Sequence, residues 1–277
     1  MFPPKKILVL LYTTLSINLI WILAVNAQQV QEQQEGVINY AYSNWIGTGY
    51  YRIEDRTIWI FRFPFQSYTL RKPEGNKWGT EILFPLTLGL DQFDFNNLNI
   101  GSFTFVPGIR FSYQVYDNWQ LKPYGQIGVG KEFKGGDWNT IWGCGIESLV
   151  LFPFKYGELQ LGNSLRFADH SQSGNEGDNG FSMFEIGLNY KRPVNLNLFS
   201  RQNNLNLFTI YKEFINDLEF FNAFNNTTRI NRLFTFGIVL SFEPSIRILG
   251  FPIKGAGLTY THGNGFTGIG LTTGFPF

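Results

Sequence analysis

Apolar and polar residues alternate with a period of two along most of the chain after Trp45. The clearest case runs from 102 to 116, where Phe103 and Phe111 fall on one face and Thr104 and Arg110 on the other. Successive side chains of a β-strand point to opposite faces, so this alternation predicts a strand with one apolar and one polar face. The same pattern returns in many later segments and predicts a fold built from such strands.

Roughly twelve strands are expected from this pattern, which is the even number typical of single-chain bacterial barrels. They are predicted at 45–53, 57–70, 79–91, 102–116, 119–133, 139–152, 157–169, 180–191, 204–214, 233–242, 250–261 and 266–277.

Several of these segments are longer than the usual strand of a soluble sheet and match the length that crosses a bilayer at a tilt. Closure into a barrel also removes the exposed edges that such apolar strands would otherwise have. The sequence therefore predicts an all-β fold, a transmembrane antiparallel β-barrel of the outer-membrane type with about twelve strands. The surrounding outer-membrane lipid is then its first partner.

The last predicted strand places Ile269, Leu271, Thr273, Phe275 and Phe277 on one face. A final strand whose apolar face is completed by an aromatic residue is similar to the terminal strand of bacterial outer-membrane barrels. By that resemblance, Phe275 and Phe277 are expected to be the membrane-insertion signal that the outer-membrane insertion machinery reads.

Composition supports strands over membrane helices. Aromatic residues make up 18% of the chain, yet the mean hydropathy is only -0.09. Alternating strands give this combination, whereas transmembrane helices need long unbroken apolar runs. The formal net charge of +1 argues against nucleic acid as a partner.

Three segments are expected along the chain. Residues 1–27 read as a signal peptide, with Lys5 and Lys6 before an apolar run and a cleavage site after Ala27. An uncleaved inner-membrane anchor is the alternative interpretation. Residues 28–44 would form a periplasmic polar tail or a lumen segment, and residues 45–277 the barrel. The predicted location is the bacterial outer membrane, with both termini in the periplasm.

Connection lengths agree with this orientation, because periplasmic turns of such barrels are short and extracellular loops longer. Counting back from Phe277 places the connections at 92–101, 134–138, 169–179, 215–232 and 262–265 outside. The turns at 116–119 and 153–156 come out periplasmic, and those at 72–78 and 191–203 are longer than the rule expects.

Short motifs across nearly the whole chain resemble one known family, the solitary outer-membrane autotransporter-like β-barrel domains. The motifs are SNWIGTG at 43–49, TIWIFR at 57–62, KPYGQIGVG at 122–130, GIE at 145–147, GAGLTY at 255–260 and GFPF at 274–277. The resemblance implies a translocator-type barrel without a secreted passenger, and it assigns no functional residues.

One candidate catalytic group lies at the end of the segment 157–169. His170 with Ser171 or Ser173 is similar to the pair used by outer-membrane lipid hydrolases, phospholipase or lipid A deacylase, in which His activates Ser. Those enzymes carry His-x-Ser-Asn, and here Asn175 is displaced. A solvated extracellular loop is the favoured interpretation. The hydrolase remains the alternative function, and the protein is expected not to be an enzyme.

A second set consists of charged residues at predicted inward positions. They are Arg110, Lys122, Glu132, Glu147, Glu158, Arg166 and Glu185. Both signs occur on neighbouring strands, so the set either lines a weakly selective pore for small solutes or pairs across the interior. Pairing is the favoured interpretation because buried charges seek partners, which gives a structural or interaction barrel.

The remaining chemistry points to the membrane. Aromatic girdles at the strand ends are expected from Trp45, Trp59, Trp119, Trp138, Tyr113, Tyr124 and Tyr260. The single cysteine, Cys144, fits an apolar wall position and excludes an internal disulfide. The sequence shows no metal motif, and no cofactor is expected.

Overall fold

The fold is a closed β-barrel, described by a computed structural model for Tyr42 and for residues 45–53, 56–70, 77–94, 97–133, 138–172, 180–196, 201–221, 227–248 and 251–277. The predicted signal peptide lies outside the described residues, as does the predicted tail apart from Tyr42. None of the described helical residues belongs to a helix long and apolar enough to cross a membrane.

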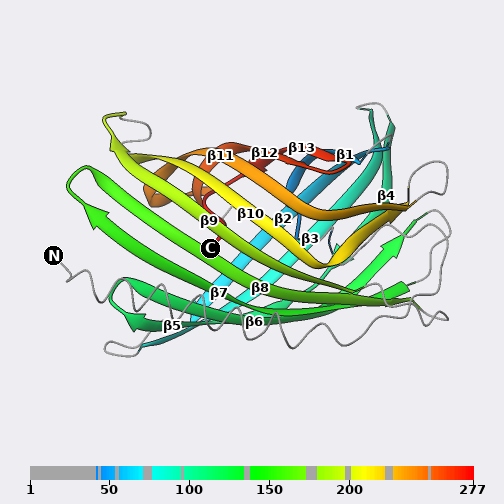
Figure 1. Cartoon of the computed structure of the whole chain (residues 1–277), viewed down its shortest axis with the longest axis horizontal. Coiled ribbons are helices and arrows are strands. Elements are labelled where there is room, and N and C mark those ends of the chain that lie inside the picture. The colour runs from blue at the N-terminus through cyan, green and yellow to red at the C-terminus, as the bar shows by residue number, and fades with distance from the viewer. Residues whose placement is uncertain are drawn as a thin grey trace. The chain divides into compact units, whose positions relative to one another are not determined.

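Thirteen strand segments build the barrel, and Figure 1 shows them running obliquely around it. They are β1 (Thr48–Ile53), β2 (Arg56–Leu70), β3 (Trp78–Asp94), β4 (Asn97–Phe105), β5 (Gly108–Tyr116), β6 (Trp119–Glu132), β7 (Trp138–Phe154), β8 (Gly157–Gln172), β9 (Phe181–Val194), β10 (Gln202–Phe221), β11 (Thr227–Ile248), β12 (Phe251–Gly263) and β13 (Phe266–Thr272).

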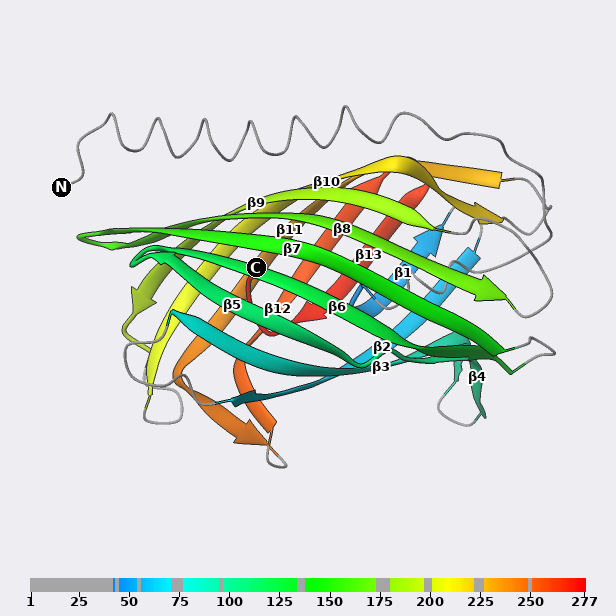
Figure 2. The same ribbon diagram turned by 90° about the horizontal axis from the view of Figure 1, so that it is seen from below.

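Neighbouring segments pair in antiparallel register, except that β4 and β5 each pair with β3 and β6 instead of with each other. Segment β1 pairs with both β2 and β13. That last pairing closes the sheet. Figure 2 shows the same closure from another side, with β13 beside β1. Closure leaves no unpaired sheet edge, which is the condition for a sheet to cross a bilayer.

Segments β4 and β5 are two parts of one strand, so the barrel has twelve strands. Both pair with β3 in the same register, with Thr104 opposite Thr87 and Arg110 opposite Glu81. The interruption falls at Pro107, whose nitrogen carries no hydrogen to donate. Hydrogen bonding continues across the gap, since the Ile127 amide donates a hydrogen bond of 3.0 Å to the Pro107 carbonyl oxygen. The single strand predicted over 102–116 is therefore confirmed, although it begins earlier, at Asn97, within the connection expected at 92–101.

The two faces of the wall follow the predicted alternation. On β11 the outward Phe234, Phe236 and Ile238 are exposed, whereas Thr235 and Val239 are buried. A face that is apolar and exposed next to an interior that holds polar residues is the reverse of a soluble protein and is typical of a membrane barrel.

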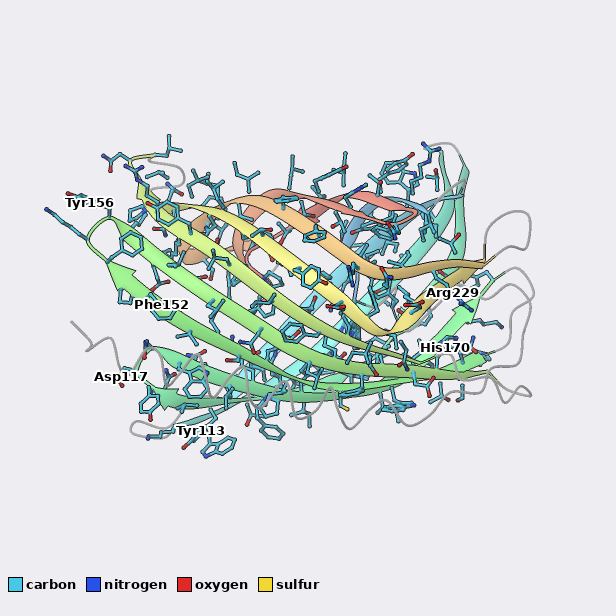
Figure 3. All side chains as sticks on the ribbon, in the orientation of Figure 1. Tyr113, Asp117, Phe152, Tyr156, His170 and Arg229 are labelled. Atoms are coloured by element: carbon cyan, nitrogen blue, oxygen red, sulfur yellow. The ribbon has the colours of Figure 1, made fainter. Side chains whose placement is uncertain are left out.

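The barrel has two ends, which Figure 3 marks through labelled residues. The Asp117 end carries the short turns β5–β6 and β7–β8, and the His170 end carries the β8–β9, β10–β11 and β12–β13 connections. This grouping agrees with the predicted alternation of turns.

Several predicted boundaries are wrong. Strand β10 runs to Phe221 and β11 begins at Thr227, so most of the connection expected at 215–232 is strand. Hairpin pairing continues there after a register shift between Glu213 and Leu218, which breaks the alternation that the prediction relied on. At the other extreme, β13 ends at Thr272 instead of continuing to Phe277, because the chain bends at 273–274.

Candidate functional site in the barrel interior

A chain of ion pairs crosses the inner face of the wall from β3 to β10. Cations and carboxylates alternate along it, and each inner member contacts two partners. The nitrogen-to-oxygen distances are 3.2 Å for Glu81 and Arg110, 3.1 Å for Arg110 and Glu147, 3.2 Å for Glu147 and Arg166, 2.6 Å for Arg166 and Glu185, and 3.1 Å for Glu185 and Lys212. We call these six residues the ionic chain.

Strand alternation and register bring these side chains together. Arg166 lies on β8 opposite Gly145 of β7, a residue without a side chain, so its guanidinium reaches Glu147 on that strand. Ser164 donates a hydrogen bond of 2.6 Å to Glu185, and the Tyr124 ring lies 5.8 Å from the Arg166 guanidinium carbon. Breaking one pair of such a buried set leaves an uncompensated charge, so the chain holds the strands in one arrangement.

Four of the predicted inward charges belong to this chain, namely Arg110, Glu147, Arg166 and Glu185. Lys122 also faces inward, opposite Glu147 in the β6–β7 register. Glu158 lies on the same face nearer the Asp117 end, where its carboxylate accepts a hydrogen bond of 2.6 Å from Gln160. The side chain of Glu132 lies outside the described residues.

Sequence reasoning missed Glu81, Lys212 and Arg62, all of which face inward. On β3, Glu81 lies an even number of positions from the buried Thr87, so both side chains point to the same face. The same holds on β10 for Lys212 and the buried Asn206. Applying the period of two strictly to β3 and β10 predicts that Glu81 and Lys212 face inward.

Toward the His170 end the interior holds a large apolar cluster. Its buried members come from strands all around the barrel and from the segment before β1. Tyr42 packs edge-on against Phe181 and Phe214, with ring centroids 5.6 and 5.4 Å apart. The full set, here the apolar layer, is Tyr42, Tyr51, Ile53, Ile60, Val106, Ile141, Ala168, Phe181, Met183, Phe214, Leu218, Ile230, Leu233 and Phe266.

On the other side of the ionic chain, the residues after β13 turn into the lumen. Phe277 is buried and packs with Phe208, Ile210 and Val239, with Leu149 and Phe275 beside them. These six residues form the Phe277 cluster. Glycines on the far wall leave the space: a Cβ on Gly162 would lie 2.3 Å from the Phe277 ring. The end of the chain marked C therefore lies within the barrel in both views (Figures 1 and 2).

Successive inward residues of β9 lie in the apolar layer, in the ionic chain and against the Phe277 cluster. Met183 lies in the apolar layer, Glu185 in the ionic chain, and Gly187 against Phe277. Asn189 then joins a network of amides near the Asp117 end and donates to Gln160 over 2.9 Å. The interior thus holds layers of unlike chemistry that follow one another along the barrel.

Phe275 and Phe277, the predicted insertion signal, are placed in this interior and not on the outward face of β13. Ile269 and Leu271 of β13 are exposed on that face, so the alternation expected across the whole segment stops at Thr272. The prediction that machinery reads the two rings concerns the unfolded chain and stays a prediction.

His170 and Ser171 do not form a pair. His170 faces inward on β8, opposite Ile141, and is buried, whereas Ser171 is exposed on the next position of the same strand. Neighbouring residues of a strand point to opposite faces, so the two side chains diverge. The solvated loop expected for His170 is also wrong, since β8 extends to Gln172. Ser173 lies outside the described residues.

Most of the predicted girdle residues lie on the outer surface near the ends. At the Asp117 end Trp78 packs on Tyr113 at 4.6 Å, and at the His170 end Lys131 lies 5.3 Å from the Trp138 ring. Trp45 and Tyr124 are the corrections, because both lie inside: Trp45 packs against the apolar layer and Tyr124 is buried beside Arg166.

Within the described ranges, no group of three or more His, Cys, Asp and Glu residues is arranged to hold a metal ion. Cys144 is exposed on the outer face of β7. Neither a known protein-family model nor a curated protein sequence matches the chain.

Proposed function

We propose that this chain is an outer-membrane β-barrel with a lumen closed by its own side chains, and that it acts as a structural or interaction barrel. The observation that carries the proposal is that both ends of the barrel sequence cross the lumen. Trp45, before β1, reaches Gly143 on β7, and Phe277, after β13, reaches Gly162 on β8. Each contact joins walls that lie nearly opposite each other in the strand order.

A closed lumen distinguishes this role from that of a diffusion pore. An open pore needs a continuous aqueous path with charges that face water. Here Glu147 and Glu185 are buried and each contacts two cations. The apolar layer and the Phe277 cluster flank these pairs on either side.

The outer-membrane location is part of the proposal. It is supported by the exposed apolar face of the wall, by aromatic residues at both ends and by the predicted signal at 1–27. Insertion machinery would read Phe275 and Phe277 before the barrel is complete, because the folded chain buries Phe277 and half-buries Phe275 among β7 to β11.

Conductance across a planar bilayer tests the closed lumen. Refolded Gln28 to Phe277 is expected to insert without steady ion current. A double variant, Trp45→Ala with Phe277→Ala, removes the two crossing contacts and is expected to raise the frequency of opening. Steady current through the unaltered chain, with insertion verified by protease protection, would refute the closed lumen.

A second candidate function is the passenger-free translocator that the sequence resemblance implies. One observation favours it: Tyr42, from the segment that precedes the barrel, is held inside by Phe181 and Phe214. An epitope placed after Gln28 separates the two roles. Cleavage of this epitope by protease added to intact cells would indicate translocation, whereas protection until the outer membrane is opened supports the closed structural barrel.

A further inference from the structure

The middle of the lumen holds more cations than carboxylates. Among the described side chains there, five cationic groups face three carboxylates: Arg62, Arg110, Lys122, Arg166 and Lys212 against Glu81, Glu147 and Glu185. Burying charge without compensation is costly, so an excess of two cations calls for a counter-charge.

Arg62 is one of the two cations that the ionic chain does not include, and Lys122 is the other. Arg62 faces inward on β2, and its electrostatic neighbours are Arg166, Arg110, Tyr124 and Glu147. Glu147 already contacts both Arg110 and Arg166. Within the described part of the chain, the buried Nε of Arg62 has no hydrogen-bond acceptor.

Other buried donors share this condition, and the Trp45 indole Nε1 and the Tyr124 hydroxyl are among them. Both lie against β7 at consecutive inward glycines. A Cβ on Gly143 would lie 2.9 Å from Trp45 Cζ2, and one on Gly145 would lie 2.8 Å from Tyr124 Oη. Alternate positions of a strand are about 7 Å apart, so these side chains are close neighbours.

The position of Arg166 brings the groups into one site. Gly145 lies between Tyr124 on β6 and Arg166 on β8 in the strand register. An indole nitrogen and a guanidinium can only donate, and a phenol hydroxyl can donate as well. Donors of this kind, gathered where positive charge is in excess, match a ligand that accepts hydrogen bonds in several directions and is negative.

We propose that the middle of the lumen holds a small inorganic oxyanion of sulfate or phosphate size, bound by Arg62, Trp45 and Tyr124 beside Arg166. The apolar layer and the Phe277 cluster enclose the site, so the anion enters as the barrel folds. The site depends only on side chains of this chain and does not rest on the proposed location or role.

Retention of selenate tests the site, because selenium can be counted directly and selenate has the shape of sulfate. Residues 28–277 are refolded in detergent with sodium selenate, desalted and analysed by mass spectrometry of the elements. The expected result is about one selenium per chain, and Arg62→Gln is expected to lower retention about tenfold, since a charge-assisted hydrogen bond contributes that much to affinity.

Arg232→Gln is the matched control, because Arg232 is exposed and its Nε lies 3.7 Å from Glu213. It is expected to retain selenate as the unaltered chain does. Competing sulfate or phosphate during refolding should displace selenate.

Three outcomes would overturn the proposal. The first is that the unaltered chain holds no selenium after desalting. The second is that Arg62→Gln retains as much selenate as the unaltered chain. The third is that chloride displaces selenate at concentrations where sulfate has no effect. If Arg62→Gln fails to fold, Tyr124→Phe and Trp45→Phe decide, since each removes one donor and keeps an aromatic ring. Full retention in both would refute the site.

Discussion

Two parts of the wall line the same lumen in opposite ways. The charged wall, β7 to β10, carries long charged side chains that point inward, and the glycine seam, β12, β13 and β1, carries many inward glycines. The inward residues of the charged wall include Glu147, Arg166, Glu185 and Lys212. Those of the seam include Gly255, Gly257, Gly263, Gly268, Gly270 and Gly49.

The difference shows that two parts of one sheet line the lumen in different ways. Side chains from the charged wall reach into the lumen, whereas the seam lets aromatic rings lie flat against its backbone. Tyr51 of β1 covers Gly268, where a Cβ would lie 2.2 Å from Tyr51 Cδ1. The Tyr51 hydroxyl donates a hydrogen bond of 2.9 Å to the Ile46 carbonyl oxygen and so fixes the segment that carries Trp45. The seam therefore positions the residue that reaches Gly143 across the lumen.

The largest effect is expected on the charged wall. Arg166→Met removes the link between Glu147 and Glu185 and should lower the free energy of unfolding by about 4 kcal/mol, because two carboxylates lose a buried partner. Denaturation by urea in phospholipid vesicles measures the change. Arg232→Gln, on the exposed surface, serves as the control. A loss below that of the control would mean that the ionic chain does not stabilise the wall.

A smaller effect is expected where the charged wall receives Phe277. Phe277→Ala empties the space against Gly162 and Gly187 and should cost about 3 kcal/mol, as deletion of a buried ring does. Phe277→Leu should recover a good part of that loss. The midpoints of unfolding in urea measure these changes. Equal midpoints for Phe277→Ala and the unaltered chain would place the ring outside the lumen.

On the seam, Gly268→Val should cost about 2 kcal/mol, since the new side chain overlaps the Tyr51 ring. The double variant Gly268→Val with Tyr51→Ala should be less destabilised than the sum of its parts, because the overlap is gone. Unfolding of all four proteins completes this cycle. Strict additivity would show that glycine is not needed there to hold the ring.

The smallest effect is expected for Tyr51→Phe, which keeps the ring over Gly268 and removes only its hydroxyl. Loss of the bond to the Ile46 carbonyl should cost about 1 kcal/mol. The same variant should make the Trp45 indole more accessible to acrylamide quenching. Unchanged accessibility would separate the seam from the closing of the lumen.

Strand alternation predicted the wall well. Phe103 against Thr104 and Phe236 against Thr235 fix which face of each strand points outward, and a run broken by Pro107 still reads as one strand. Four members of the ionic chain followed from the same rule. The sequence predicts a loop at His170, although pairing with β7 carries the strand on to Gln172.

The sequence by itself determined the twelve-stranded barrel and the inward charges, because the period of two is a local property that each strand carries alone. The tertiary structure alone decided what fills the lumen. Trp45 and Phe277 carry no local mark of an interior position. They become buried only because closure brings Gly143 and Gly162 of distant strands opposite them. Contacts across a closed barrel join residues far apart in sequence, so no local pattern records them.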